Sequence, residues 1–138
     1  MTLDPAMVTA GERLKAAGLR PTRQRLALGR LLFHGATRHV TAEQLHTEAA
    51  AGDTKVSLAT VYNTLHQFTA AGLLREVVVE AGRSYFDTNV SSHHHFFYVD
   101  TADLADISAD QITVSAMPPL PQGCALDRVD VIVRVRRA

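Results

Sequence analysis

The spacing of apolar residues changes once along this 138-residue chain, and this change restricts the possible folds more than any other feature. Between residues 8 and 72, apolar side chains recur every three or four positions, as they do in amphipathic α-helices. After residue 73, apolar and polar side chains alternate, which is the period of a half-buried β-strand. We therefore expect an α+β fold in which the helices come first and the strands follow.

Four helices are predicted, because four amphipathic segments either follow a capping residue or precede a glycine. The expected N-caps of the second, third and fourth helices are Thr22, Thr41 and Ser57. The four helices are expected to end near Gly18, His34, Ala51 and Gly72. The apolar stripe of the fourth helix consists of Leu58, Val61, Leu65 and Phe68. Its opposite face carries small and polar side chains, which is unusual for a helix so well capped.

A β-hairpin is predicted directly after the fourth helix. Residues 73–79 and 84–87 have the pattern of strands, and Gly82 lies in the tight turn between them. Helices followed by such a hairpin make a winged helix-turn-helix domain, which we place at residues 1–85. Beyond it, the aromatic residues 96–98 and the alternating valines of 129–135 predict a second, mainly β domain over residues 86–138.

Composition and charge limit the class of protein further. No apolar run approaches the roughly 20 residues that a membrane-spanning helix needs. Cys124 is the only cysteine, which excludes an internal disulfide and a CxxC pair and favours a reducing compartment. Residues 1–85 carry a net charge of +3 and residues 86–138 a net charge of −3, a weak indication that the first part meets phosphates. We expect a cytoplasmic protein that does not bind a membrane.

The polar face of the fourth helix is the candidate DNA-reading surface, because the major groove admits a single helix. The Tyr62 ring can press on thymine methyl groups while its hydroxyl reaches a phosphate, and Asn63 can pair with adenine. Arginines at the junction of the first two helices can contact the DNA backbone or the minor groove. The residues expected to bind DNA are Arg20, Arg23, Arg25, Ser57, Thr60, Tyr62, Asn63 and Thr64. Periodicity alone is equally compatible with a solvated helix face.

A run of three histidines is the candidate sensing site. In a strand, His93 and His95 point to one face and His94 to the other, so two imidazoles can converge on a metal ion. The residues that could complete such a site are Asp87, Asp106 and His39. Imidazole and carboxylate ligands favour Fe(II), Mn(II) or Zn(II), and five of them suit the first two better than tetrahedral zinc. The alternative is a polar strand edge that binds no metal.

Three motifs, in matching order and spacing, resemble the ferric uptake regulator family. They are residues 18–25 (GLRPTRQR), residues 57–65 (SLATVYNTL), and YFD at 85–87 with HHH at 93–95. The resemblance covers residues 8–110 closely and the last strand more loosely. It implies a winged helix, a C-terminal α/β dimerisation domain, and a homodimer that reads an inverted-repeat operator in double-stranded DNA.

The resemblance also implies roles for single residues. Arg20 matches the family's minor-groove contact and Tyr62 its base-contacting tyrosine. The residues that match ligands of the family's regulatory metal site are His39, Asp87, His93, His95 and Asp106. With the DNA-binding domain placed at residues 1–85, His39 would be the only ligand that comes from it. A bound metal ion would therefore tie the two domains together.

Departures from the family pattern point to one branch. Tyr98 and Thr101 stand where the family's structural zinc site has cysteines, so zinc held by cysteines is excluded. Asn63 stands where most iron-binding members have arginine. These departures and the histidine triplet are similar to the iron response regulator branch, whose members respond to haem. The resemblance thus implies haem at His93, His94 and His95, since histidine is a common haem ligand.

The expected function is therefore an iron- or haem-responsive transcriptional regulator, mainly a repressor, of genes for iron uptake and haem metabolism. The alternative within the family is a peroxide sensor that uses Fe(II) or Mn(II) at the same five ligands. A different class is a small non-haem iron enzyme, because two histidines and a carboxylate can form a facial triad. No residue is evident for orienting a substrate, so we expect no enzymatic activity.

Overall fold

The computed structural model describes residues 4–138, and it confirms the α+β class. The chain forms two compact units that meet in the sequence between Val90 and Ser91, whereas the expected boundary lay between residues 85 and 86. Each unit has its own sheet. No helix of the described residues is long and apolar enough to cross a membrane.

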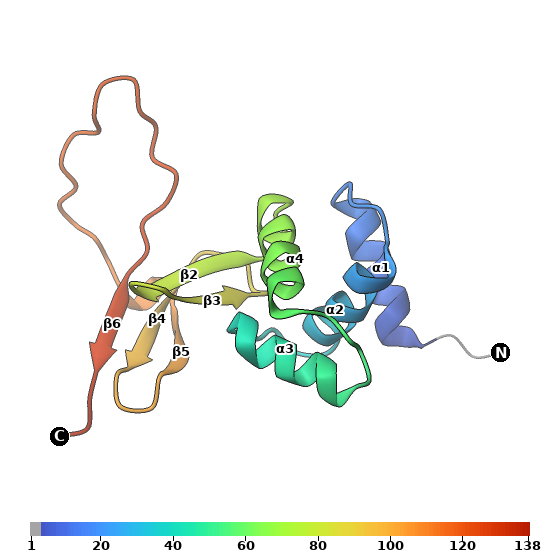
Figure 1. The fold of residues 1–138 in the computed structure, drawn as a ribbon. Helices are drawn as coiled ribbons and strands as arrows, with labels where there is room; N and C mark the ends of the chain where they lie inside the picture. Colours follow the sequence, from blue (N-terminus) through green and yellow to red (C-terminus); the bar gives the residue numbers. More distant parts are fainter. Residues whose placement is uncertain (1–3) are drawn as a thin grey trace. The chain divides into compact units, whose positions relative to one another are not determined.

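Four helices make up most of the first unit (Figure 1). They are α1 (Pro5–Ala16), α2 (Arg23–Phe33), α3 (Ala42–Ala51) and α4 (Leu58–Ala70). The predicted N-caps are confirmed, since the side chains of Thr22, Thr41 and Ser57 each accept a hydrogen bond from the backbone three residues on. At the end of α1, Gly18 has a φ of +78°, a conformation that glycine adopts without strain.

A three-stranded antiparallel sheet completes this unit. Its strands are β1 (His39–Val40), β2 (Arg75–Glu80) and β3 (Arg83–Asp87), in the order β1-β3-β2. The β2–β3 hairpin is the predicted wing, and Gly82 in its turn has a φ of +73°. Four helices with this hairpin make the winged helix-turn-helix arrangement that the sequence predicted.

The core of the first unit joins α4 to the other helices and to the sheet. Fully buried members of this core include Leu14, Leu28, Leu45, Val61, Leu65, Phe68 and Phe86. The Phe33 and Phe68 rings lie 5.8 Å apart between α2 and α4. The expected stripe is wrong at one position: Leu58 is 36% exposed, because it is the first residue of α4 and lies before the helix reaches the core.

The second unit is a small sheet of three strands. These are β4 (His93–Tyr98), β5 (Asp103–Ser108) and β6 (Ile132–Val135), in the order β5-β4-β6, with β4 antiparallel to β5 and parallel to β6. Residues 91–138 contain no α-helix, only the 3-10 turn η1 (Ala109–Gln111). The last strand is shorter than the alternation over 129–135 predicted. Residues 112–131 instead form a long, mostly exposed connection around the proline-rich segment 117–121.

Candidate metal centre and nucleic-acid interface

Strand β4 holds the histidine triplet as the sequence predicted, with alternate side chains on opposite faces. His93 and His95 share a face, and their ring centroids are 4.6 Å apart. Both side chains are buried, with 5% and 1% of each residue exposed. His94 lies on the other face, where its Nδ1 accepts a hydrogen bond of 3.1 Å from the backbone N–H of Val131.

The antiparallel partner strand brings a carboxylate to the two imidazoles. The register of β4 and β5 places Asp106 directly opposite His95. Asp106 Oδ1 lies 3.4 Å from His95 Nε2 and 3.6 Å from His93 Nε2. Two donors that bind one ion with bonds of about 2.1 Å are about 3.0–3.4 Å apart, so these separations are close to those of a shared metal ion. We define His93, His95 and Asp106 as the donor cluster.

A further contact orients one of the imidazoles. His93 Nδ1 lies 2.7 Å from the carbonyl oxygen of Ser91. An imidazole that donates from Nδ1 to a carbonyl keeps its Nε2 lone pair for a ligand, the usual arrangement for histidines that bind metals. Within the second unit, the donor cluster therefore supplies three of the five expected metal ligands, with suitable chemistry and spacing.

The first unit holds the other two expected ligands next to each other. His39 on β1 pairs directly with Asp87 on β3, so their side chains emerge on the same face of that sheet. Asp87 is 1% exposed, and its Oδ1 accepts a hydrogen bond of 2.9 Å from the backbone N–H of Asn89. Strand β2, which flanks β3 on the edge opposite β1, places Arg75 at the register position facing Asp87, and Arg75 is also buried. Sequence reasoning did not single out Arg75, because an arginine followed by Glu76 in a strand gives no sign that it is buried.

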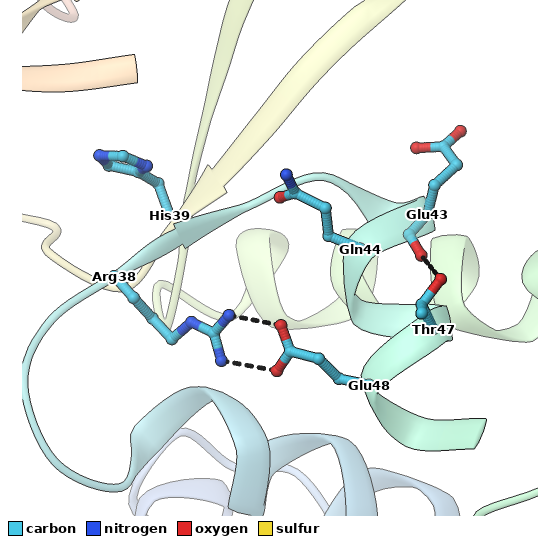
Figure 2. Close-up of a pocket in the computed structure, with 6 residues that line it drawn as sticks. All are labelled: Arg38, His39, Glu43, Gln44, Thr47 and Glu48. Carbon is cyan, nitrogen blue, oxygen red and sulfur yellow. Dashed lines mark hydrogen bonds and ion pairs between the residues drawn. The ribbon is translucent and has the colours of Figure 1, made fainter. Parts of the chain in front are cut away.

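Beside His39 lies an open hollow of about 580 Å³ (Figure 2). Two of the residues that line it form an ion pair: the Arg38 guanidinium donates two hydrogen bonds to the Glu48 carboxylate, of 2.8 and 2.6 Å. Arg38 also donates to the carbonyl oxygen of Leu31, which ties the residue before β1 to α2. The Glu48 carboxylate raises the pKa of Arg38 above its ordinary value, because it stabilises the charged guanidinium. This pair braces the segment that carries His39.

The candidate reading surface lies on α4, and most of its predicted members are accessible. Asn63 and Ser57 are exposed, and Thr60 is half-buried. Ser57 is committed to the helix N-terminus, where its hydroxyl contacts the Thr60 hydroxyl at 2.9 Å. Thr64 is 5% exposed and donates its hydroxyl proton to the Thr60 carbonyl, so that proton is not available to a phosphate. The expected contact of Thr64 with DNA stays a prediction.

Tyr62 makes a contact that the sequence did not predict. Its hydroxyl donates a hydrogen bond of 2.7 Å to Glu43 Oε1 on α3. This bond lowers the pKa of Glu43, with a smaller contribution from Arg83, and it raises the pKa of Tyr62. The two shifts agree, since the bond stabilises both the ionised carboxylate and the neutral phenol. Glu43 lies too far away in the sequence for helix periodicity to have identified it.

The arginines near the start of α2 divide into two groups. Arg20 and Arg23 are exposed. Arg25 is engaged by the protein: it donates to the Arg20 carbonyl at 2.9 Å and, through Nε and Nη2, to Gln67 Oε1 at 3.3 and 3.1 Å. Arg25 therefore ties the start of α2 to α4.

These arginines and the polar residues of α4 surround a second hollow of about 500 Å³. Its lining consists of Arg20, Thr22, Gln24, Arg25, Thr60, Asn63, Thr64 and Gln67. A basic, polar hollow beside an exposed helix face is suited to a phosphate backbone.

Comparison with known proteins agrees with this arrangement. The ferric uptake regulator family model matches residues 16–126. The chain is 33% identical over 102 residues to the ferric uptake regulation protein of Vibrio cholerae, which covers 73% of this chain and 68% of the relative. It is 35% identical over 100 residues to that of Escherichia coli, which covers 72% and 68%.

Solved structures show the same fold. The ferric uptake regulator of Pseudomonas aeruginosa with manganese matches with a TM-score of 0.70 and 26% identity over 93% of this chain and 97% of that one. The Vibrio cholerae ferric uptake regulator matches with a TM-score of 0.72 and 24% identity over 92% and 98%. The chain therefore belongs to the ferric uptake regulator family and is a metal-responsive transcriptional regulator, not an enzyme.

Proposed function

We propose that the chain binds operator DNA as a homodimer and that a divalent metal ion, held by the donor cluster with Asp87 and His39, sets the affinity. The observation that carries this proposal is the convergence of three donor atoms from His93, His95 and Asp106, all within 4.8 Å of one another. Two of these donors are buried imidazoles. Imidazole nitrogens and carboxylate oxygens are common direct ligands of transition-metal ions.

The mechanism follows from which residues would share the ion. His39 and Asp87 lie side by side in the first unit, and the donor cluster lies in the second. An ion bound by both groups would favour one arrangement of the two units by the free energy of the extra bonds. In a dimer, that arrangement would determine the spacing of two α4 helices and hence their fit to an inverted repeat.

The donor chemistry supports Mn(II) or Fe(II) over haem. Imidazole and carboxylate donors without thiolate suit these ions, and the Pseudomonas aeruginosa relative was solved with manganese. The haem response expected from the sequence has weaker support, because all three histidines are at most 8% exposed and His94 Nδ1 already accepts a hydrogen bond. We therefore propose that a divalent metal ion is the signal that sets DNA affinity, and the experiment below also tests haem.

The test is a fluorescence-anisotropy titration with a duplex enriched from a random library by the Mn(II)-loaded protein. We expect Mn(II) to raise affinity at least tenfold and haem to leave it unchanged. Asp106→Asn should abolish the response to Mn(II), since it removes the charge of a donor that is half exposed and costs little stability. Asp103→Asn is the matched control, because it makes the same change at an exposed position of β5.

Three results would overturn parts of this proposal. If no duplex is enriched, the DNA-binding role is wrong. If both aspartate variants respond to Mn(II) as the unaltered chain does, the assignment of the ion to the donor cluster is wrong. If haem but not Mn(II) changes the affinity, the signal is haem.

A further inference from the structure

The contact between Glu43 and Tyr62 joins two helices at the reading surface. The Thr41 capping box starts α3 and places Glu43 at its second helical position, on the exposed side. Its side chain points away from the Arg38–Glu48 pair, which Figure 2 shows. Its carboxylate accepts the Tyr62 hydroxyl hydrogen at 2.7 Å across a separation of 19 residues.

The tyrosine ring has a second contact on its own helix. Its centroid lies 6.3 Å from that of His66, one turn further along α4. The His66 ring in turn lies 5.7 Å from the ring of Phe86, which is fully buried in the core. The Tyr62 phenol is thus held at its hydroxyl by Glu43 of α3 and along its ring by His66, which packs on the core. A side chain held at two places loses little further freedom when it binds a partner.

This arrangement changes what Tyr62 can offer to DNA. Its hydroxyl proton is already donated to a carboxylate, so it is not available to a phosphate oxygen. The negative charge of Glu43 beside the hydroxyl also repels a phosphate at that end. The half-buried ring is the part left for contact, and an aromatic ring makes a favourable apolar contact with the methyl group of thymine.

We propose that Glu43 is a positioning residue for DNA recognition, which fixes the Tyr62 hydroxyl so that the ring contacts a thymine methyl group. This inference rests on the proposed DNA-binding function. Glu43 touches the tyrosine and not the base. Its effect therefore passes through Tyr62, and the effects of changing the two residues are not additive.

The first test compares thymine with uracil, which lacks the methyl group, at each thymine of the duplex enriched by the Mn(II)-loaded protein. At one or more positions, uracil should weaken binding by the unaltered chain about fourfold, the value of one buried methylene-sized group. Glu43→Ala should lower affinity for the thymine duplex by roughly three- to tenfold, the range of one hydrogen bond, and should remove the preference for thymine. In a Tyr62→Phe background, Glu43→Ala should have little further effect.

Two variants separate positioning from charge. Glu43→Gln keeps an oxygen that accepts the hydrogen bond, and it should retain the preference for thymine. Glu12→Ala removes an exposed glutamate from α1 of the same unit and should behave as the unaltered chain does. If Glu43→Gln loses the preference as Glu43→Ala does, Glu43 acts through its charge and the positioning role is overturned.

The second test needs no DNA. With tyrosine labelled at Cζ by ¹³C, NMR titration should show that Tyr62 ionises at a lower pH in Glu43→Ala than in the unaltered chain. An unchanged Tyr62 titration overturns the hydrogen bond and the proposal with it. If no duplex is enriched but the titration shifts, the DNA-binding function fails while the contact between the two residues stands, and the recognition role is overturned. An unchanged thymine preference in Glu43→Ala overturns the role while leaving DNA binding intact.

Discussion

Neighbouring histidines of one strand have different surroundings, because successive side chains point to opposite faces. His93 faces Asp106 at 3.6 Å, whereas His94 accepts a hydrogen bond from the segment before β6. We predict that His93→Ala lowers Mn(II) affinity at least tenfold, since a ligand imidazole is lost. His94→Ala should retain Mn(II) affinity and cost about 1 kcal/mol of unfolding free energy for its lost hydrogen bond. Calorimetric metal titration and urea unfolding of both variants check this; equal loss of metal in the two would contradict the assignment.

The Arg38–Glu48 pair provides a second prediction at the scale of single residues. Its side chains are 33% and 36% exposed, so solvent screens much of the attraction despite the two parallel hydrogen bonds. A double-mutant cycle with Arg38→Met and Glu48→Gln should give a coupling free energy of about 0.5–1 kcal/mol. The cycle cancels the separate loss of the Arg38 bond to the Leu31 carbonyl. Urea unfolding measures the coupling, and a value near zero would mean that the pair does not brace β1.

At the scale of elements, the stability of α3 depends more on Thr41, the residue that caps its start, than on its interior. Thr41 and Gln44 form a reciprocal capping box, which satisfies two backbone N–H groups that the helix leaves open. Thr41→Ala should therefore lower the free energy of unfolding by about 1 kcal/mol. The control is Thr47→Ala in the same helix, where an exposed hydroxyl only bonds back to the Glu43 carbonyl. That change should be neutral or slightly stabilising, because alanine is the better helix former. Equal destabilisation of both variants by thermal unfolding would contradict the capping argument.

At the scale of the whole molecule, the proposed ion would couple two units that have separate sheets. We predict that Mn(II) slows hydrogen exchange in peptides around His39 in the first unit and around Asp106 in the second, because the ligands of both become ordered together. Asp106→Asn should lose both effects at once. Exchange followed by mass spectrometry provides the measurement. Protection confined to the second unit would show that His39 and Asp87 are not ligands.

Much of the fold could be read from the sequence because its signals act over a few residues. Each capping threonine or serine contacts the backbone three positions away, and Gly82 meets the demand of a two-residue turn. The strand period of two likewise places His93 and His95 on one face. These features depend on local backbone geometry, so the sequence alone determined the starts of α2, α3 and α4, the hairpin and the shared face of the two imidazoles.

Other features required the tertiary structure. The register of β4 and β5 decided that Asp106, and not Asp103, faces His95. The packing of α2 against α4 decided that Arg25 bonds Gln67, 42 residues away, and the depth of α4 in the core buried Thr64. Each depends on which surfaces meet when distant segments pack, and no local pattern encodes that choice. The sequence by itself therefore determined which side chains could bind metal or DNA, and only the folded chain decided which of them are brought together and left accessible.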